Sequence, residues 1–92
     1  MDKNELKGYR DKLDVIDDKI LKLYEERMDI CRKIGEYKVE HAMSVYDPER
    51  ETEVLEQVMN KVSNPEYADG AAQMFLSMMQ ASVEMQEALY EN

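Results

Sequence analysis

Tryptophan is absent from this 92-residue chain, and the residues that form tight turns are scarce, with three glycines and two prolines. So few turn formers disfavour a fold built from many short strands. The chain also has one cysteine and one histidine. Cys31 cannot form a disulfide within the chain, and Cys31 with His41 cannot complete a zinc site. Phosphate-binding loops, dinucleotide-binding glycine motifs and metal-binding motifs are also missing.

Basic residues are the minority, because 12 lysines and arginines stand against 21 acidic residues and give a net charge of −9. Without a basic run to neutralise phosphates, we expect neither nucleic acid nor an anionic membrane as a partner. No apolar run approaches the ~20 residues that a membrane span needs. The chain is nevertheless 43% hydrophobic, which is too much for a disordered acidic protein. These features predict a soluble, cytoplasmic, helical protein with a single domain, residues 1–92.

The clearest pattern is a stripe of apolar residues at alternating steps of three and four, with one charged interruption. The pattern predicts one long helix over about residues 4–40. Gly8 and Gly35 lie within it, and each lowers helix propensity by about 1 kcal/mol relative to alanine. We call this stripe the seam, and it consists of Leu6, Tyr9, Leu13, Ile16, Ile20, Leu23, Arg27, Ile30, Ile34 and Tyr37.

Two shorter helices follow, each opened by a capping residue and a proline. Asp47 and Pro48 predict a helix over about residues 47–62, and Asn64 and Pro65 predict another over about 65–90. The expected fold is therefore all-α, with a long, a short and a medium helix.

The length of the first helix predicts a dimer. A helix over residues 4–40 is about 55 Å long, whereas a compact chain of this size has a radius of gyration of about 12 Å. The other two helices cannot cover a seam of that length. We therefore expect an intertwined homodimer in which the long helices of two chains pack together.

Cations occupy or flank the seam. A buried guanidinium at Arg27 needs an anion, which is either a carboxylate of the protein, such as Glu51, or an anionic ligand. Lys38 lies at nearly the same helical angle, so both cations can line one groove, although a solvated helix end also explains Lys38. Arg10 is about 25 Å from Arg27 along the helix, so it cannot serve the groove of Arg27 within its own helix, but it could serve that of a partner chain in an antiparallel pairing.

The two shorter helices also carry polar residues on their inner faces. Asp47, Arg50 and Glu51 fall in the first turn of the second helix, where capping explains Asp47 but not Glu51. Ser82 and Gln86 interrupt the apolar stripe of the third helix, and an inward glutamine needs partners for its amide. Polar groups from three helices, including three of the four arginines, indicate a pocket for a small polyanion.

At these positions the chain resembles the all-helical chorismate mutases, the AroQ class, over about residues 6–89. The resemblance implies the [3,3] rearrangement of chorismate to prephenate, in phenylalanine and tyrosine biosynthesis. It also implies a domain-swapped homodimer that needs no cofactor and no metal. The residues that carry the resemblance are Arg10, Arg27, Lys38, Asp47, Arg50, Glu51, Ser82 and Gln86.

The resemblance also assigns roles to these residues. Lys38 and Gln86 would donate hydrogen bonds to the ether oxygen of chorismate, where negative charge develops as the bond breaks. Glu51 and the backbone near Asp47 would take the ring hydroxyl. The two carboxylates of the substrate would be held, with help from Ser82, by Arg27, Arg50 and Arg10 of the other subunit. The expected protein is a stand-alone, monofunctional enzyme.

Two other functions compete with this interpretation. An isochorismate-pyruvate lyase would share the cationic pocket, but it need not keep Glu51 as a hydroxyl-binding acid. A non-catalytic helical dimerisation module would explain the seam, but not the inward positions of Arg27, Ser82 and Gln86.

Overall fold

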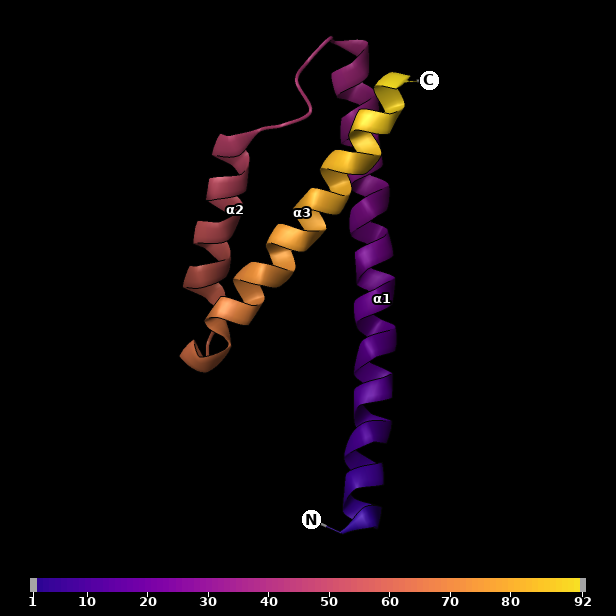
Figure 1. Cartoon of the computed structure of the whole chain (residues 1–92), viewed down its shortest axis with the longest axis vertical. Helices are drawn as coiled ribbons and strands as arrows, with labels where there is room; N and C mark the ends of the chain where they lie inside the picture. The colour runs from indigo at the N-terminus through magenta and orange to yellow at the C-terminus, as the bar shows by residue number, and fades with distance from the viewer. Residues whose placement is uncertain (1, 92) are drawn as a thin grey trace. The chain divides into compact units, whose positions relative to one another are not determined.

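The computed structural model describes residues 2–91, and its regular structure over that range is helical throughout (Figure 1). The predicted all-α class, with a long, a short and a medium helix, is confirmed for these residues. The predicted domain limits, residues 1 and 92, lie outside the described range. The elements follow in the order α1 (Lys3–Glu40), α2 (Pro48–Lys61), the 3-10 turn η1 (Pro65–Tyr67) and α3 (Ala68–Glu91).

Helix α2 begins at the capping sequence that predicted it. Asp47 has non-helical backbone angles, and its side chain accepts a hydrogen bond from the backbone nitrogen of Arg50 at 3.1 Å. Pro48 takes the first helical position, where a missing N–H group has no cost. The helix therefore starts at residue 48 and not at 47. It ends at Lys61 because Val62 has an extended backbone.

The start of the third helix differs from the predicted one. The Asn64 side chain accepts a hydrogen bond from the backbone nitrogen of Glu66 at 3.0 Å, and Pro65 follows it as the sequence predicts. The first turn is nevertheless the 3-10 turn η1, and α3 itself starts only at Ala68. A tighter turn of this kind is common where an α-helix begins.

The chain divides between Ile30 and Cys31 into two units that share α1. The first unit contains only the amino-terminal part of α1, and none of its described residues is buried. Helices owe most of their stability in proteins to packing of an apolar face and not to helix propensity. Yet the apolar seam residues of this unit remain 39–62% exposed, namely Leu6, Tyr9, Leu13, Ile16, Ile20, Leu23 and Ile30.

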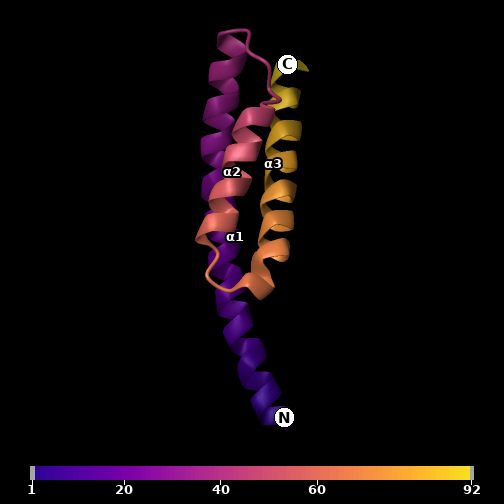
Figure 2. The same ribbon diagram turned by 90° about the vertical axis from the view of Figure 1, so that its left-hand side faces the viewer.

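In the second unit, α2 and α3 pack together and run in opposite directions (Figure 2). The last turns of α3 lie beside the last turns of α1, where the Tyr90 hydroxyl lies 3.0 Å from the carbonyl oxygen of Lys38. The core of this unit is small, and polar side chains make up much of it. Its buried residues within the described range are Gly35, Val45, Met79, Ser82 and Gln86.

Helix α1 ends in a Schellman motif. The backbone nitrogen of Met43 donates to the carbonyl of Lys38 at 2.8 Å, and that of Ala42 donates to Val39 at 3.2 Å. Ala42 has a φ of 53°, in the left-handed region that favours glycine. The Tyr90 hydroxyl reaches the carbonyls of both Lys38 and Met43. The loop after α1 is thus tied to α3 as well as to its own helix.

Candidate active site

Gln86 is the most deeply buried polar side chain of the second unit, with 4% of its surface exposed. From α3 it reaches α1, where its Nε2 donates to the carbonyl oxygen of Cys31 at 2.6 Å. A carbonyl only accepts hydrogen bonds, so the nitrogen and not the oxygen of the amide must face it. An amide NH2 group has two protons, and this bond uses one of them. The other proton can be donated to a ligand.

Ser82 lies one turn before Gln86 on the same face of α3 and is 8% exposed. Both residues are therefore on the inner side of this helix, as their spacing within the apolar stripe predicts. Most buried polar side chains in proteins form hydrogen bonds. This pair gives α3 a polar patch within an otherwise apolar face.

Lys38 lies in the last turn of α1, where a hydrogen bond holds its side chain. Its Nζ donates to the backbone carbonyl of Val45 at 2.9 Å, and the side chain is half-buried. The ammonium group has three protons, so this bond leaves two for other acceptors. Because a carbonyl carries no net charge, the bond fixes the direction of the ammonium group without neutralising it.

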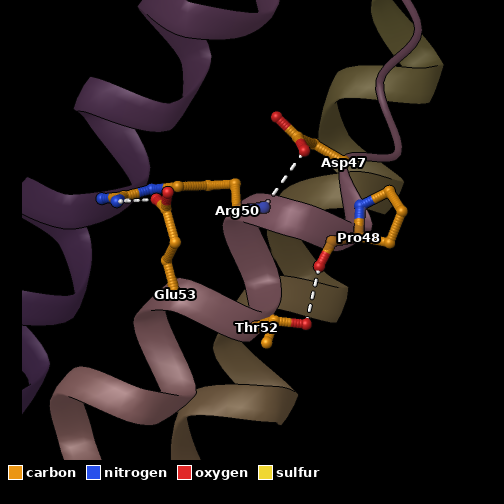
Figure 3. A network of polar contacts seen from close by, with 5 residues as sticks. All are labelled: Asp47, Pro48, Arg50, Thr52 and Glu53. Carbon is orange, nitrogen blue, oxygen red and sulfur yellow. Dashed lines mark hydrogen bonds and ion pairs between the residues drawn. The ribbon is translucent and has the colours of Figure 1, made fainter.

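A polar network occupies the start of α2 (Figure 3). Asp47 caps the helix through the backbone of Arg50, and Thr52 Oγ1 donates to the carbonyl of Pro48 at 3.0 Å. The Arg50 guanidinium pairs with Glu53, with 3.1 Å between Nη1 and Oε2, and both side chains are more than half exposed. Exposed pairs of this kind contribute only about 0–1 kcal/mol. Arg50 can therefore exchange Glu53 for another carboxylate at little cost.

The remaining predicted residues lie on α1 and α2. Glu51 is half-buried in the first turn of α2. Arg10 and Arg27 both belong to the unit that ends at Ile30, where Arg10 is exposed and Arg27 is half-buried. Among the predicted residues, the hydrogen bonds and the ion pair described above involve Lys38, Asp47, Arg50 and Gln86.

Sequence reasoning missed three contributors to this region. Helix propensity marks Gly35 only as a weak point in a helix, yet Gly35 is buried in α1. Val45 supplies the carbonyl that holds Lys38, and Tyr90 ties the loop after α1 to α3. The glycine had a signal, since a glycine inside a strong helical pattern can mark close packing. Backbone acceptors leave no such signal.

The region combines two donors held by backbone carbonyls, Lys38 and Gln86, with the exposed, ion-paired guanidinium of Arg50. Within residues 2–91, no group of three or more histidine, cysteine, aspartate or glutamate residues is arranged to hold a metal ion. Over the same range, the helices are too short or too polar to cross a membrane. Preorganised donors are suited to stabilise negative charge on a substrate or a transition state.

The sequence profile described as chorismate mutase type II matches residues 9–87. The chain belongs to this family. The match to the chorismate mutase type II profile includes every predicted site residue, from Arg10 to Gln86.

Curated proteins similar to this chorismate mutase type II chain are much longer than it is. A bifunctional chorismate mutase/prephenate dehydratase of Aquifex aeolicus is 40% identical over 55 residues, 60% of this chain and 15% of that protein. A protein of the same description from Buchnera aphidicola is 33% identical over 88 residues, 94% of this chain and 23% of that protein. The T-protein of Haemophilus influenzae is 31% identical over 51 residues, 55% of this chain and 14% of that protein. The chain thus spans less than a quarter of the length of each of these relatives.

Proposed function

We propose that this chain catalyses the rearrangement of chorismate to prephenate, with residues 1–92 acting as one chorismate mutase domain. The observation that supports this most is the family match, which spans the whole predicted site. The reaction is an intramolecular [3,3] shift, so it needs no nucleophile and no general base. The protein has to hold the substrate folded and stabilise the charge that develops on the ether oxygen.

In this proposal, Lys38 and Gln86 donate to the ether oxygen. Both side chains are already fixed by one hydrogen bond to a backbone carbonyl, at Val45 and Cys31 respectively. Each group has at least one further proton to donate. Because the donors are held before the substrate arrives, little reorganisation is needed as the ether bond breaks.

The two carboxylates of chorismate are assigned to the arginines. Arg50 would leave its exposed partner Glu53 for a substrate carboxylate, and Arg27 and Ser82 would complete the site from the same chain. Arg10 would come from the other subunit. A planar guanidinium suits this task because it can donate two parallel hydrogen bonds to one carboxylate.

The ring hydroxyl of chorismate is assigned to the start of α2. The Asp47 carboxylate is occupied as the helix cap, so its backbone is the part we expect to meet the substrate. Glu51 is half-buried in the same turn and would accept the hydroxyl proton in a hydrogen bond. An acid near this helix start is also favoured by the helix dipole.

We further propose that the working unit is an intertwined homodimer. Three features support it, of which the first two are the exposed seam of α1 and the small core of the second unit. A third is an apolar groove of about 320 Å³ on α2 and α3. A second copy of the chain has an apolar surface to cover this groove, whose lining is Val54, Gln57, Val58, Lys61, Val62, Ala71 and Phe75.

The decisive experiment follows the loss of chorismate absorbance in the presence of the purified chain, with prephenate identified as the product. Lys38→Ala and Gln86→Ala should each lower kcat by about 100-fold or more, the usual effect of losing one preorganised donor. Lys33→Ala, which removes an exposed cation from the same helix, is the matched control and should not change kcat. Absence of prephenate would refute the proposed activity. Pyruvate release from isochorismate, in the same protein, would point to the lyase instead.

Shared sites can be tested by mixing chains. Arg10→Ala and Lys38→Ala should each be inactive alone, whereas a heterodimer of the two should hold one complete site. Random exchange should therefore restore about a quarter of the sites. A verified heterodimer without recovered activity would show that Arg10 does not act across the dimer.

A further inference from the structure

Gly35 lies where α1 meets α3, and the structure leaves no room there for a side chain on α1. A Cβ atom added at Gly35 would lie 2.7 Å from Cγ of Gln86, 2.9 Å from Cδ1 of Leu89 and 3.3 Å from Cβ of Gln86. At Gly8 and Gly70, by contrast, an added Cβ would meet nothing within 4 Å. Only one of the three glycines thus makes room for another helix.

The room at Gly35 is used by the side chain of Gln86. Its Cβ and Cγ pass over the glycine, and its amide then bonds the carbonyl of Cys31, one turn earlier on α1. Gly35 thus faces Cγ of Gln86, and this Cγ carries the amide group of the same side chain. Leu89 meets the added methyl only with the end of a flexible side chain, so it can move aside easily. Gln86 is tethered at both ends, by α3 and by its hydrogen bond.

We infer that Gly35 is a positioning residue, which sets the place of the Gln86 amide by leaving space for its side chain. Glycine is among the poorest residues for a helix interior, so helix propensity alone would favour alanine here. The close contact to Gln86 gives a reason for glycine at this position. The role of Gly35 in catalysis rests on the proposed function, but its role in placing the amide does not.

A methyl group at residue 35 should move the amide away from its present position. Contacts of 2.7 Å between carbon atoms are not tolerated, so Gln86 must change its rotamer or α3 must shift. Either change would break or lengthen the bond to Cys31. The donor intended for the ether oxygen would then be misplaced, and a misplacement of about 1 Å can lower turnover by about 100-fold. Because the donor acts in the transition state, kcat should fall more than KM rises.

The experiment compares Gly35→Ala with Gly70→Ala, a glycine replacement in α3 that meets no neighbour. In 15N-labelled protein, the side-chain amide signal of Gln86 is identified by its loss in Gln86→Ala. In Gly35→Ala this signal should shift, and its protons should exchange with water about tenfold faster or more, because the buried hydrogen bond is lost. In Gly70→Ala, the position of the Gln86 signal and the exchange rate of its protons should stay as in the unchanged chain. An unchanged Gln86 signal in Gly35→Ala, or an equal shift in Gly70→Ala, would overturn the inference.

The double variant Gly35→Ala/Gln86→Ala covers the case in which Gly35→Ala does not fold. Truncation of Gln86 removes Cγ and leaves the 3.3 Å approach to Cβ and the 2.9 Å approach to the flexible end of Leu89. The double variant should therefore fold and have a higher thermal midpoint than Gly35→Ala. A double variant as unstable as Gly35→Ala would show that Gln86 is not the residue that Gly35 accommodates.

Turnover of chorismate is measured on the same proteins and separates the inference from the proposed function. If the unchanged chain makes no prephenate, the proposed function fails, while the amide signal still decides the role of Gly35. If the chain is active, Gly35→Ala should lower kcat by about tenfold or more, with a smaller change in KM. Full activity of Gly35→Ala would overturn its role in catalysis.

Discussion

Replacing Ile16 and Ile20 together with alanine should dissociate the proposed dimer. The two side chains are 49% and 51% exposed, so each has about half of its surface left for a partner to bury. Full burial of an isoleucine contributes about 1.5–3 kcal/mol, which gives about 1 kcal/mol for each half. A symmetric interface contains each residue twice. The double variant should therefore lose about 4 kcal/mol of association free energy, a roughly thousandfold weaker dimer.

Alanine is the right replacement because it keeps the helix. Its helix propensity exceeds that of isoleucine, so a lost dimer cannot be blamed on a poorer helix former. The matched control is Asp18→Ala/Lys22→Ala, which removes two exposed polar side chains from the same stretch and leaves the net charge unchanged. This control should associate as the unchanged chain does.

Sedimentation equilibrium over a range of concentrations measures the association directly. The unchanged chain should have twice its monomer mass of 10.8 kDa, and the double variant should have the monomer mass at the same concentration. Helix content from circular dichroism should fall as the dimer dissociates, because the first unit has no core of its own. Equal dissociation constants for the double variant and the unchanged chain would refute the role of the seam. An unchanged chain that is monomeric at every concentration would refute the dimer.

Three smaller changes test the site and the loop beside it. Gln86→Glu should confine turnover to acidic pH, because only a protonated carboxyl can donate and an ordinary glutamate has a pKa of about 4.3; a kcat–pH profile parallel to that of the unchanged chain would contradict this. Tyr90→Phe removes the hydroxyl from the carbonyls of Lys38 and Met43 and should cost about 1 kcal/mol, seen as a thermal midpoint lower by about 4–8 °C. An unchanged midpoint would show that the hydroxyl does not hold the loop. Ala42→Gly should raise the urea midpoint by relieving a φ of 53°, with a net gain of about 0.5–1 kcal/mol after the entropy of the unfolded glycine is counted. A lower midpoint would contradict it.

The helices could be predicted because their signals are local. The seam repeats over many turns of α1, so a single charged interruption does not obscure it. Asp47 with Pro48 and Asn64 with Pro65 mark helix starts through hydrogen bonds that span only two or three residues. The turn η1 was not predicted, because the same cap and proline can open either a 3-10 turn or an α-helix.

The burial of Ser82 and Gln86 could also be predicted from their place in an apolar stripe. The partner of Gln86 could not, because it is a backbone carbonyl 55 residues away. Every residue has such a carbonyl, so no residue type marks the one that is used. Gly35 was misread for a related reason. Whether glycine is needed at residue 35 depends on the distance to another helix, whereas helix propensity describes a helix in isolation.

The way the two proposed ether-oxygen donors are held fits the charge that they have to meet. Lys38 and Gln86 both bond neutral carbonyls, whereas Arg50 pairs with the carboxylate of Glu53. A carboxylate beside Lys38 would fix the ammonium group equally well. Its negative charge, however, would cancel much of the positive electrostatic field of that group at the ether oxygen. A carbonyl fixes the donor and leaves the field intact, which matters in a chain with a net charge of −9. In the proposed site Arg50 would need no such protection, because a substrate carboxylate would replace Glu53 in an exposed pair of small energy. Neutral anchors at the bond that breaks, and an exchangeable anion where the substrate binds, are what electrostatic catalysis of this rearrangement requires.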